Sequence, residues 1–434
     1  MKIELQPLFI AITWLLICMA NQISAQTMTP APKSIPGLKP GNDPSFVLNH
    51  LLEYSSYSTQ MQDGRLEGEG ADFLKALARE SQFVLVGEEH GHSGTAKFTT
   101  ALWHLLHETA DFEFAAFEID RWVAETMEKE IRAGGLNAWT QFLNQCGGAN
   151  TVPFFDWKEE VELADAIVKS SKVNGFPAIW GIEQVYIEAF EWQLLYIAKG
   201  AQNVEARQLA AYCAEEASKS RKWIVSNIDQ FAQLAELLNN PIDSTFANMA
   251  NAMTKSAQIY KPFIVGEGEY FLANHIREQM IRRNFLEYYR AAEKATMKPP
   301  RVMMKYGAYH LYRGATPTNV QGLGGFMTEF SVVTGVGGTL AMLVITDEEG
   351  AVTTFEDKSY DAKDWFIKNW GFLTPLLKSG DIGVFDLRAW RMRPNRWAHL
   401  PESTRLAINS YDILIVAPGS GSTLLPGLNK TLKP

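Results

Sequence analysis

The sequence predicts an α/β fold, with a mostly parallel central sheet flanked by helices and with an inserted helical subdomain. Short apolar runs alternate with helical patterns along the chain, which is typical of sheets with parallel strands. Several of these runs end directly at a glycine or a glutamate. Between about 186 and 298 the strand signals almost disappear and helical patterns follow one another. The first two observations predict the sheet, and the third predicts the insertion.

The first segment of the chain, residues 1–25, has the layout of a secretory signal peptide. A basic start precedes an apolar run over Leu8–Ala20, and the small residue Ala25 stands at a suitable cleavage point. Cys18 offers lipid attachment as an alternative, but the bulky residue before it fits a lipoprotein cleavage site poorly. We therefore expect cleavage after Ala25 and a secreted or periplasmic protein.

A proline-rich tether over 26–44 precedes the α/β domain, which we expect to span 45–434. Two helices are predicted between Pro44 and Ala78 from the spacing of apolar residues. Short, continuous apolar runs predict buried strands at 83–86, 114–117, 178–182, 302–306, 340–345 and 412–416.

The predicted insertion holds three or four helices between Tyr186 and about Met297. Pro241 separates two of them, and Pro262 begins another break. A long final helix is expected from about Glu269 through Ala295. We expect this helical part to cover the cleft and to set specificity.

Composition excludes several classes of function for a chain of 434 residues that is 46% hydrophobic and 21% charged. The net charge of -9 argues against nonspecific nucleic-acid binding, which needs a basic face. After the signal peptide no apolar run reaches the ~20 residues of a membrane helix. Only Cys146 and Cys213 remain, which excludes a disulfide scaffold and a cysteine zinc cluster. One disulfide or two free thiols both fit this count.

Four ionisable residues follow the first predicted strand in a glycine-containing loop: Glu88, Glu89, His90 and His92. A histidine beside a carboxylate is the usual general-base unit, because the carboxylate orients the ring and raises its basicity. The same residue types also bind metal ions. A solvated acidic loop is the alternative without function.

Three further residues stand at or just beyond later strand ends. Glu118 and Glu183 directly follow apolar strands, where a carboxylate is either paired in a salt bridge or functional. His310 follows the strand at 302–306 by a few residues. Because ligands bind at the carboxyl ends of parallel strands, we expect these side chains to share one pocket with Glu88 and the loop histidines.

The ordered series of motifs resembles the erythromycin esterase-like proteins, in a wider group with the haem-binding ChaN proteins and the Tiki/TraB proteins. The resemblance runs from about Phe83 to Leu424. The matching segments are Gly87–His92, Phe114–Glu118, Gly181–Glu183, Arg277-Glu278 with Asn284, Val302–His310, Phe385–Arg388 and Tyr411–Ile415. The macrolide esterases have two residues between the first glutamate and histidine. Here one residue lies between Glu88 and His90, whereas Glu89 and His92 restore the esterase spacing.

The resemblance implies hydrolysis of an ester, lactone or similar acyl bond of a small molecule by a histidine-activated water. We expect His90, in preference to His92, to be the base. The other expected roles are orientation of the base by Glu88, positioning of the water by Glu118, polarisation or protonation of the leaving oxygen by His310, and substrate binding by Arg277, Glu183 and Glu89. The family is divided on cofactors, so a haem- or metal-binding protein that uses the histidines remains the alternative, with a divalent metal or haem as its ligand.

Overall fold

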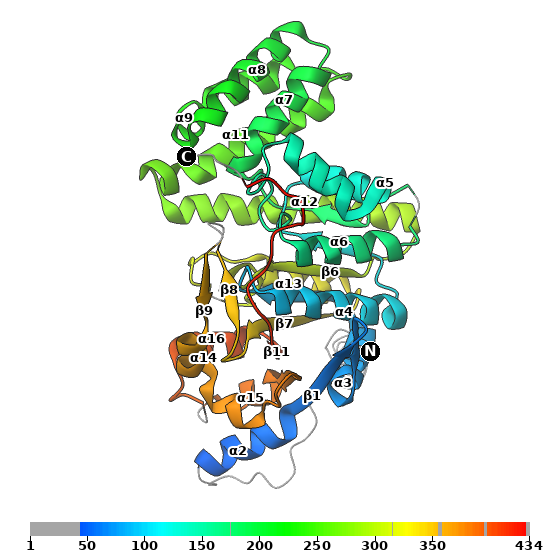
Figure 1. The fold of residues 1–434 in the computed structure, drawn as a ribbon, viewed down its shortest axis with the longest axis vertical. Helices are drawn as coiled ribbons and strands as arrows, with labels where there is room; N and C mark the ends of the chain where they lie inside the picture. Colours follow the sequence, from blue (N-terminus) through cyan, green and yellow to red (C-terminus); the bar gives the residue numbers. More distant parts are fainter. Residues whose placement is uncertain (1–43, 174, 315, 355–357, 395–396, 431–434) are drawn as a thin grey trace, which may run out of the picture.

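The computed structural model describes residues 44–430 except 174, 315, 355–357 and 395–396. A mixed sheet forms the middle of the molecule, and a group of helices stands above it in Figure 1. The predicted signal peptide and most of the predicted tether lie outside the described residues. Within those residues, no helix combines the length and the apolar content that a membrane crossing requires.

The central sheet has nine strands in the order β2-β1-β10-β11-β7-β3-β6-β4-β5. The strands are β1 (Ser56–Gln62), β2 (Arg65–Glu67), β3 (Ser81–Glu88), β4 (Phe114–Phe117), β5 (Ile179–Gly181), β6 (Val302–Gly307), β7 (Gly338–Thr346), β10 (Ile382–Asp386) and β11 (Ile413–Ala417). All neighbours from β11 to β5 are parallel, and the pairs at the β2 end are antiparallel. The predicted mostly parallel α/β sheet is therefore confirmed, together with each of the six predicted strands.

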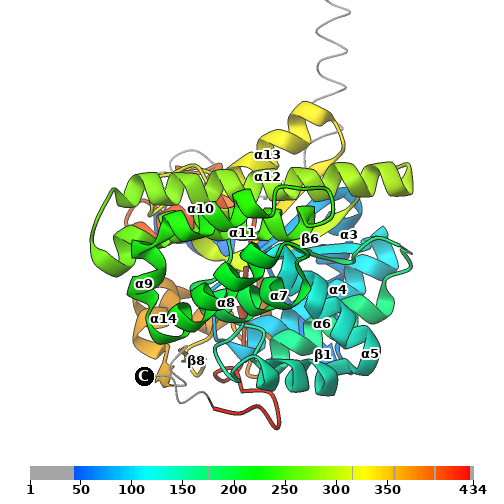
Figure 2. The same cartoon turned by 90° about the horizontal axis from the view of Figure 1, so that it is seen from above.

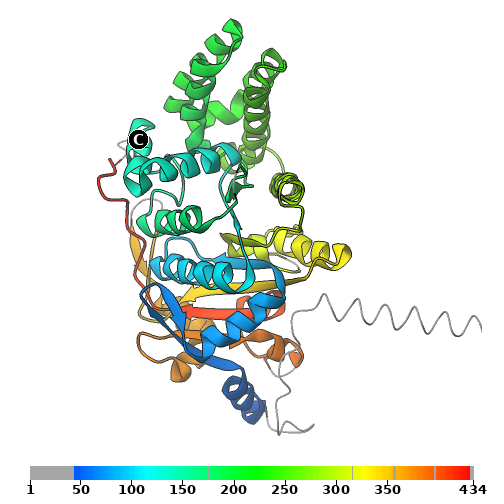
Figure 3. The same ribbon diagram turned by 90° about the vertical axis from the view of Figure 1, so that its right-hand side faces the viewer.

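Helices cover both faces of the sheet (Figure 3). One face carries α3 (Glu69–Glu80), α4 (Ser93–Ala110), α5 (Arg121–Gln145) and α6 (Lys158–Ser170). The other face carries α2 (Pro44–Ser55), α12 (Tyr270–Thr296), α13 (Leu323–Thr334), α14 (Lys363–Trp370), α15 (Leu387–Arg391) and α16 (Glu402–Ser410). The strands are apolar on both sides for this reason: in β3, Val84 and Val86 join one core, and Phe83 and Leu85 join the other.

The remaining helices form the group above the sheet: α7 (Phe190–Gly200), α8 (Val204–Lys219), α9 (Arg221–Ser226), α10 (Ile228–Leu237) and α11 (Ser244–Val265). Short 3-10 turns occur at η1 (Ile187–Ala189), η2 (Ala308–Leu311) and η3 (Gly371–Leu376). Figure 2 shows α12 crossing the molecule beside α10 and α11. The long helix expected over 269–295 is confirmed as α12, and it packs Phe285 edge-on against Phe83 of the sheet at 5.9 Å between ring centroids.

Four features differ from the sequence-based expectation. Six α-helices, not three or four, lie between Tyr186 and Met297, because the short α9 and α10 are separated by single residues that leave no loop signal. Pro262 lies inside α11, whose end comes three residues later at Val265. A hairpin, β1–β2, separates the two N-terminal helices; its mostly polar strands lie at the sheet edge and lack an apolar run. Strand β10 was also not foreseen.

The remaining features are a small ribbon and the two cysteines. A two-stranded ribbon, β8 (Ala351–Thr353) with β9 (Ser359–Asp361), lies outside the main sheet. Cys146 and Cys213 carry free thiols, which resolves the choice that the sequence left open. Burial raises the pKa of Cys146 to about 11 and that of Cys213 to about 12, so neither thiol is a ready nucleophile at neutral pH.

Candidate active site

The carboxyl ends of β3, β6, β4 and β5 lie side by side. Strand pairing sets Glu88 opposite Gly307, and Phe117 opposite both Lys305 and Gly181. The residues just beyond these strands therefore meet at one edge of the sheet, which is where open α/β sheets bind ligands. The strand ends also explain why distant sequence segments contribute to a single cluster.

Glu118 is the centre of this cluster. Its Oε2 accepts a hydrogen bond from the backbone N–H of Gly307 at 2.7 Å, and its Oε1 accepts one from Nη2 of Arg277 at 2.9 Å. Nε2 of His90 lies 3.6 Å from Oε2, and Nε2 of His310 lies 3.7 Å from Oε1. Burial alone would raise the pKa of Glu118, but the two histidines and Arg277 outweigh burial and lower it. Glu118 is thus held as a carboxylate between two imidazoles.

Behind His90, a chain of buried charges fixes the ring. Nδ1 of His90 is 3.0 Å from Oε1 of Glu88, which also lies 2.6 Å from Nζ of Lys305. Lys305 in turn donates to Oε1 of Glu160 at 2.8 Å. Burial opposes the charge on Glu88, but Lys305 and His90 outweigh it and hold the pKa of Glu88 at about 2.

This ionised glutamate changes the basicity of His90. Burial lowers the pKa of the ring, but the hydrogen bond that His90 donates to Glu88 and the charge of Glu118 more than offset burial, so the pKa of His90 is raised. His90 is still reachable, because about a quarter of its side chain, 26%, is exposed. A fixed, accessible imidazole with raised basicity has the properties of a general base.

His310 has a matching partner on the other side of Glu118. Its Nδ1 lies 2.5 Å from Oε1 of Glu278 on α12. The second oxygen of Glu278 and the hydroxyl of Tyr306 are both buried without a hydrogen-bond partner in the described structure. The Tyr306 ring packs edge-on against His310 at 5.8 Å. Two Glu–His pairs, Glu88–His90 and Glu278–His310, therefore face one central carboxylate.

Arg277 and Glu183 support this arrangement from the side of β5. Arg277 bonds both oxygens of Glu183, from Nε and Nη2, at 3.0 Å each. The Glu183 side chain is fully buried and also accepts the backbone N–H of Gln184. Asn284, about two helical turns further along α12, donates to the backbone oxygen of Ile182. Arg277 therefore holds Glu118 in position and is itself held by Glu183; we call this Glu183–Arg277 pair the Arg277 brace.

An aromatic ring lies against His90. Phe154 stacks on the imidazole with 4.1 Å between ring centroids and 26° between planes. Its backbone has φ 69°, a left-handed conformation that a bulky residue rarely adopts. The Tyr186 ring packs edge-on against the Phe154 ring, with 5.9 Å between ring centroids. The strained position of Phe154 is consistent with a constraint at a functional site.

His92 and Glu89 lie away from the cluster. His92 is 2% exposed, its Nδ1 is 3.0 Å from the Thr95 hydroxyl, and it pairs with Gly421 of the C-terminal segment as a β-bridge. Desolvation by burial lowers the pKa of His92 to about 4. Glu89 accepts a hydrogen bond from the hydroxyl of Tyr360 in β9. Neither residue of the alternative esterase spacing contacts Glu118.

Within the described part of the chain, one set of side chains brings enough donor atoms together for a metal ion. Glu118, Glu183 and His310 each offer a ligand atom, and these atoms lie within 4.8 Å of one another. Arg277 already binds both carboxylates of this set. A divalent ion there would have to displace the guanidinium, so the residues fit an Arg-braced carboxylate cluster better than a metal site.

The sequence analysis missed four residues that contact the cluster. Lys305 left a signal, since a lysine inside a buried strand requires a charged partner. Glu278 stands beside Arg277 in a matched motif but received no role. Glu160 lies on α6 among several acidic residues, and nothing in the sequence distinguishes it. Phe154 lies in a loop, where aromatic residues give no positional information.

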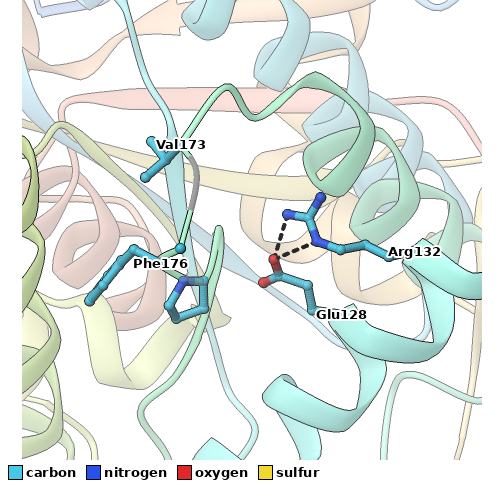
Figure 4. A pocket seen from close by; sticks show the side chains of 6 residues that line it. Glu128, Arg132, Val173 and Phe176 are labelled. Atoms are coloured by element: carbon cyan, nitrogen blue, oxygen red, sulfur yellow. Dashed lines mark hydrogen bonds and ion pairs between the residues drawn. The ribbon is translucent and has the colours of Figure 1, made fainter.

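Two pockets lie near opposite ends of β5. One of about 490 Å³ lies between α11, α12 and the start of α5, and Glu183 lines its inner end. The other, of about 380 Å³, lies before the start of the strand and is shown in Figure 4. There Glu128 bonds Arg132 and accepts the backbone N–H groups of Ala178 and Ile179. The second pocket is therefore built around a structural carboxylate, away from the histidines.

Solved structures with the same fold include a succinoglycan biosynthesis protein, with a TM-score of 0.56, 14% identity, and coverage of 87% of this chain and 98% of that one. A mutant of the erythromycin esterase EreC in an open conformation has a TM-score of 0.54 and 12% identity, over 87% of this chain and 100% of that one. A Bacillus cereus protein has a TM-score of 0.55 and 12% identity, over 88% of this chain and 99% of that one. No family model and no curated protein sequence matches the chain. The expected erythromycin esterase-like fold is thus confirmed. Sequence identities this low support the shared fold and do not establish activity.

Proposed function

We propose that this protein is a hydrolase of the erythromycin esterase-like type, which cleaves an ester- or lactone-type bond with a water activated by His90. The observation that carries the proposal is the arrangement of two Glu–His pairs on either side of Glu118. Two imidazoles held on one carboxylate provide a proton acceptor and a proton donor a short distance apart. Acyl-bond hydrolysis needs both. The shared fold with an erythromycin esterase supports the same chemistry.

In the proposed reaction, Nε2 of His90 takes a proton from a water molecule that Glu118 holds in place. The water oxygen forms a bond to the carbonyl carbon, and the carbonyl π electrons move to its oxygen. As the tetrahedral species collapses, the acyl C–O bond breaks and the protonated ring of His310 gives its proton to the leaving oxygen. His90 then releases its proton to solvent and His310 takes one up from solvent, so that both rings return to their starting states. The products are an acid and an alcohol, or one hydroxy acid from a lactone. Glu88 and Glu278 orient the rings and stabilise their charged forms.

Arg277 acts in this proposal as a positioning residue. Its bonds to Glu118 and Glu183 fix the carboxylate between the two histidines. A guanidinium is suited to this role because its planar donors bind two carboxylates at defined angles. Loss of this brace would displace Glu118, and small displacements of reacting groups lower rates strongly.

The direct test is hydrolysis of 4-nitrophenyl acetate and of a panel of simple lactones by the purified chain and by His90→Ala. A general base contributes ~10²–10⁴-fold to the rate, so kcat should fall by that order. The fold should survive, because His90 is partly exposed. Retention of full kcat by His90→Ala would refute the assignment of the base.

His92→Ala is the matched comparison from the same loop. Because His92 is buried and packed against the C-terminal segment, we expect it to lower stability by ~0.5–3 kcal/mol. The kcat of the folded fraction should change far less than that of His90→Ala. A large loss of kcat without a loss of melting temperature in His92→Ala would transfer the role of base to His92.

A second candidate function is metal or haem binding, favoured by the proximity of Glu118, Glu183 and His310. Elemental analysis of protein purified without chelators, and visible spectra after growth with haem, separate this candidate from the hydrolase. A stoichiometric metal or a strong visible band would support the carrier. The Arg277 brace weighs against it, because the guanidinium already supplies the positive charge that the carboxylates need.

The N-terminal layout leads us to propose a location outside the cytoplasm for this hydrolase, with residues 1–25 removed on export. The substrate would then be a small molecule met in the periplasm or outside the cell. The acyl-bond chemistry leaves the alcohol and acid parts of this molecule open.

A further inference from the structure

The pocket of about 490 Å³ between α11 and α12 differs from the cluster in its chemistry. On α11 its lining recurs at helical spacing as Asn248, Asn251, Lys255 and Gln258, and on α12 as Ile276, Gln279, Arg283 and Glu287. Residues with this spacing share one face of a helix. Two helix faces rich in amides and charges are therefore turned toward the same hollow.

The charges of this pocket do not cancel. Its two carboxylates are already bonded to arginines: Glu287 to Arg121 at 3.0 Å, and Glu183 to Arg277. Lys255 and Arg283, by contrast, form no ion pair with any part of the chain that the structure describes. Two uncompensated cations line a hollow that is large enough for a small ligand.

The neutral side chains of the pocket further restrict which chemical groups it can bind. Asn248, Asn251 and Gln258 present amide groups that can both donate and accept hydrogen bonds, as hydroxyl groups require. Trp122 adds a flat apolar surface at the start of α5. Cations, amides and one indole together suit an anion that carries several hydroxyl groups.

The inner end of the pocket connects it to the proposed chemistry. Glu183 lines the pocket and is also the carboxylate that holds Arg277 against Glu118. Asn284 lines it too and bonds the backbone at the end of β5. A molecule bound in the pocket would therefore contact Glu183, which Arg277 links to Glu118.

We propose that this pocket binds a hydroxyl-rich anionic group of the substrate, such as a sugar acid, through Lys255 and Arg283. The identification of the bound molecule as the substrate rests on the proposed hydrolase function; the anion site itself does not. An enzyme with this pocket would prefer acylated sugar acids to neutral or cationic esters.

Isothermal titration of the full chain with glucuronate, with glucose and with acetate tests the anion site. We expect glucuronate to bind at least about tenfold more tightly than either of the others, and its affinity to fall as salt is raised, since exposed charges are screened. The double variant Lys255→Glu/Arg283→Glu should weaken glucuronate binding by about tenfold or more. Equal binding of glucose and glucuronate, or no binding of glucuronate, would overturn the anion site.

The matched control is Arg290→Glu/Lys294→Glu, which reverses one arginine and one lysine on an exposed part of α12 outside the pocket. Its net charge equals that of the test variant, so long-range effects of charge are the same. It should bind glucuronate as the unmodified chain does. An equal loss in both variants would assign the effect to net charge and overturn the pocket.

Competition kinetics test the connection to the substrate. Glucuronate should raise KM for an acetylated glucuronate without changing kcat, and His90→Ala should still bind glucuronate while it loses hydrolysis. Binding without competition would overturn the assignment of the anion to the substrate. Glucuronate binding by a chain that hydrolyses no ester would instead refute the hydrolase and leave the anion site standing.

Discussion

Glu88→Gln is the sharpest test of the proposed mechanism, because it removes one charge next to the proposed base and leaves the shape almost unchanged. Glu88 bonds Nδ1 of His90 at 3.0 Å and is ionised, with its pKa held at about 2 by Lys305 and His90 against the effect of burial. Hydrogen bonds to charged groups contribute ~1.5–3 kcal/mol. Because 1.36 kcal/mol corresponds to about one pKa unit, their loss corresponds to about one to two units. Lys305 lies 2.6 Å from the same oxygen and offsets part of the charge, so we expect a shift of about one unit.

The direction of this shift follows from the role of His90. A general base works in its neutral form, so kcat/KM should rise with pH through the pKa of His90, which Glu88 and Glu118 raise in the unmodified protein against the effect of burial. Without the negative charge the imidazolium is less stable and the pKa of His90 falls. The rising limb should therefore move to lower pH by about one unit, and the plateau should fall because the base is weaker.

The assay is kcat/KM for 4-nitrophenyl acetate from about pH 5 to about pH 9, corrected for spontaneous hydrolysis. Glu89→Gln is the control, since Glu89 is the next residue along the chain and bonds Tyr360 instead of His90. It should leave the limb in place. A limb that stays fixed in Glu88→Gln, or moves to higher pH, would show that His90 is not the group that titrates. Lys305 keeps Glu160 as a partner at 2.8 Å, so the variant should remain folded.

Gly307→Ala should lower kcat by up to ~10²-fold, because the new Cβ would lie 2.8 Å from Nε2 of His90 and displace the ring. The melting temperature should change little, because the φ of -50° at this position suits alanine. Initial rates and circular dichroism measure the two effects, and an unchanged kcat would contradict the position of the His90 ring. The mature protein from its native host should begin near Gln26. Intact mass checks this, and a diacylglycerol on Cys18 would instead show a membrane-anchored lipoprotein.

The sheet could be predicted from sequence because its central strands are buried on both faces and therefore read as continuous apolar runs. The same rule failed at the edge: β1 is Ser-Tyr-Ser-Thr-Gln-Met-Gln, and most of its side chains are at least partly exposed. The hairpin gains its stability from pairing with β10, a contact between segments more than 300 residues apart. A local pattern cannot contain that information.

The central part of the site could be predicted for a related reason. Glu88 ends β3, Glu118 directly follows β4 and Glu183 lies two residues beyond β5. Parallel strands bring their carboxyl ends to one edge of the sheet. The choice between His90 and His92 was harder, because the backbone conformation of Gly91 between them determines which ring faces the cluster. In the structure the backbone at Gly91 has φ 85°, and beyond this turn His92 lies beneath the C-terminal segment. That segment is more than 320 residues away in sequence, so the burial of His92 left no local signal.

The residues that sequence analysis missed share a physical reason. Lys305 bonds both Glu88 and Glu160 inside the protein, and Glu278 orients His310 from a helix that crosses the other face of the sheet. Each acts only through a partner that is distant in sequence. A buried charge in a strand predicts that a partner exists, but the identity of the partner requires the packing of α6 and α12 against the sheet.

The division of labour between sheet and helices has a consequence for substrate range. Glu88 and Glu118 depend on strand ends, whose positions are fixed by the register of the sheet, and Glu278 depends on a buried position of α12. The cationic pocket depends instead on solvent-exposed residues of α11 and α12. Exposed helix residues can change with little effect on stability, so charge in this pocket can vary while the cluster stays intact. In the proposed hydrolase, the substrate charge that the pocket accepts could therefore change without change to the hydrolytic cluster. The proposal that Lys255 and Arg283 bind an anion accordingly predicts that reversal of these two charges alters substrate preference while the cluster remains intact.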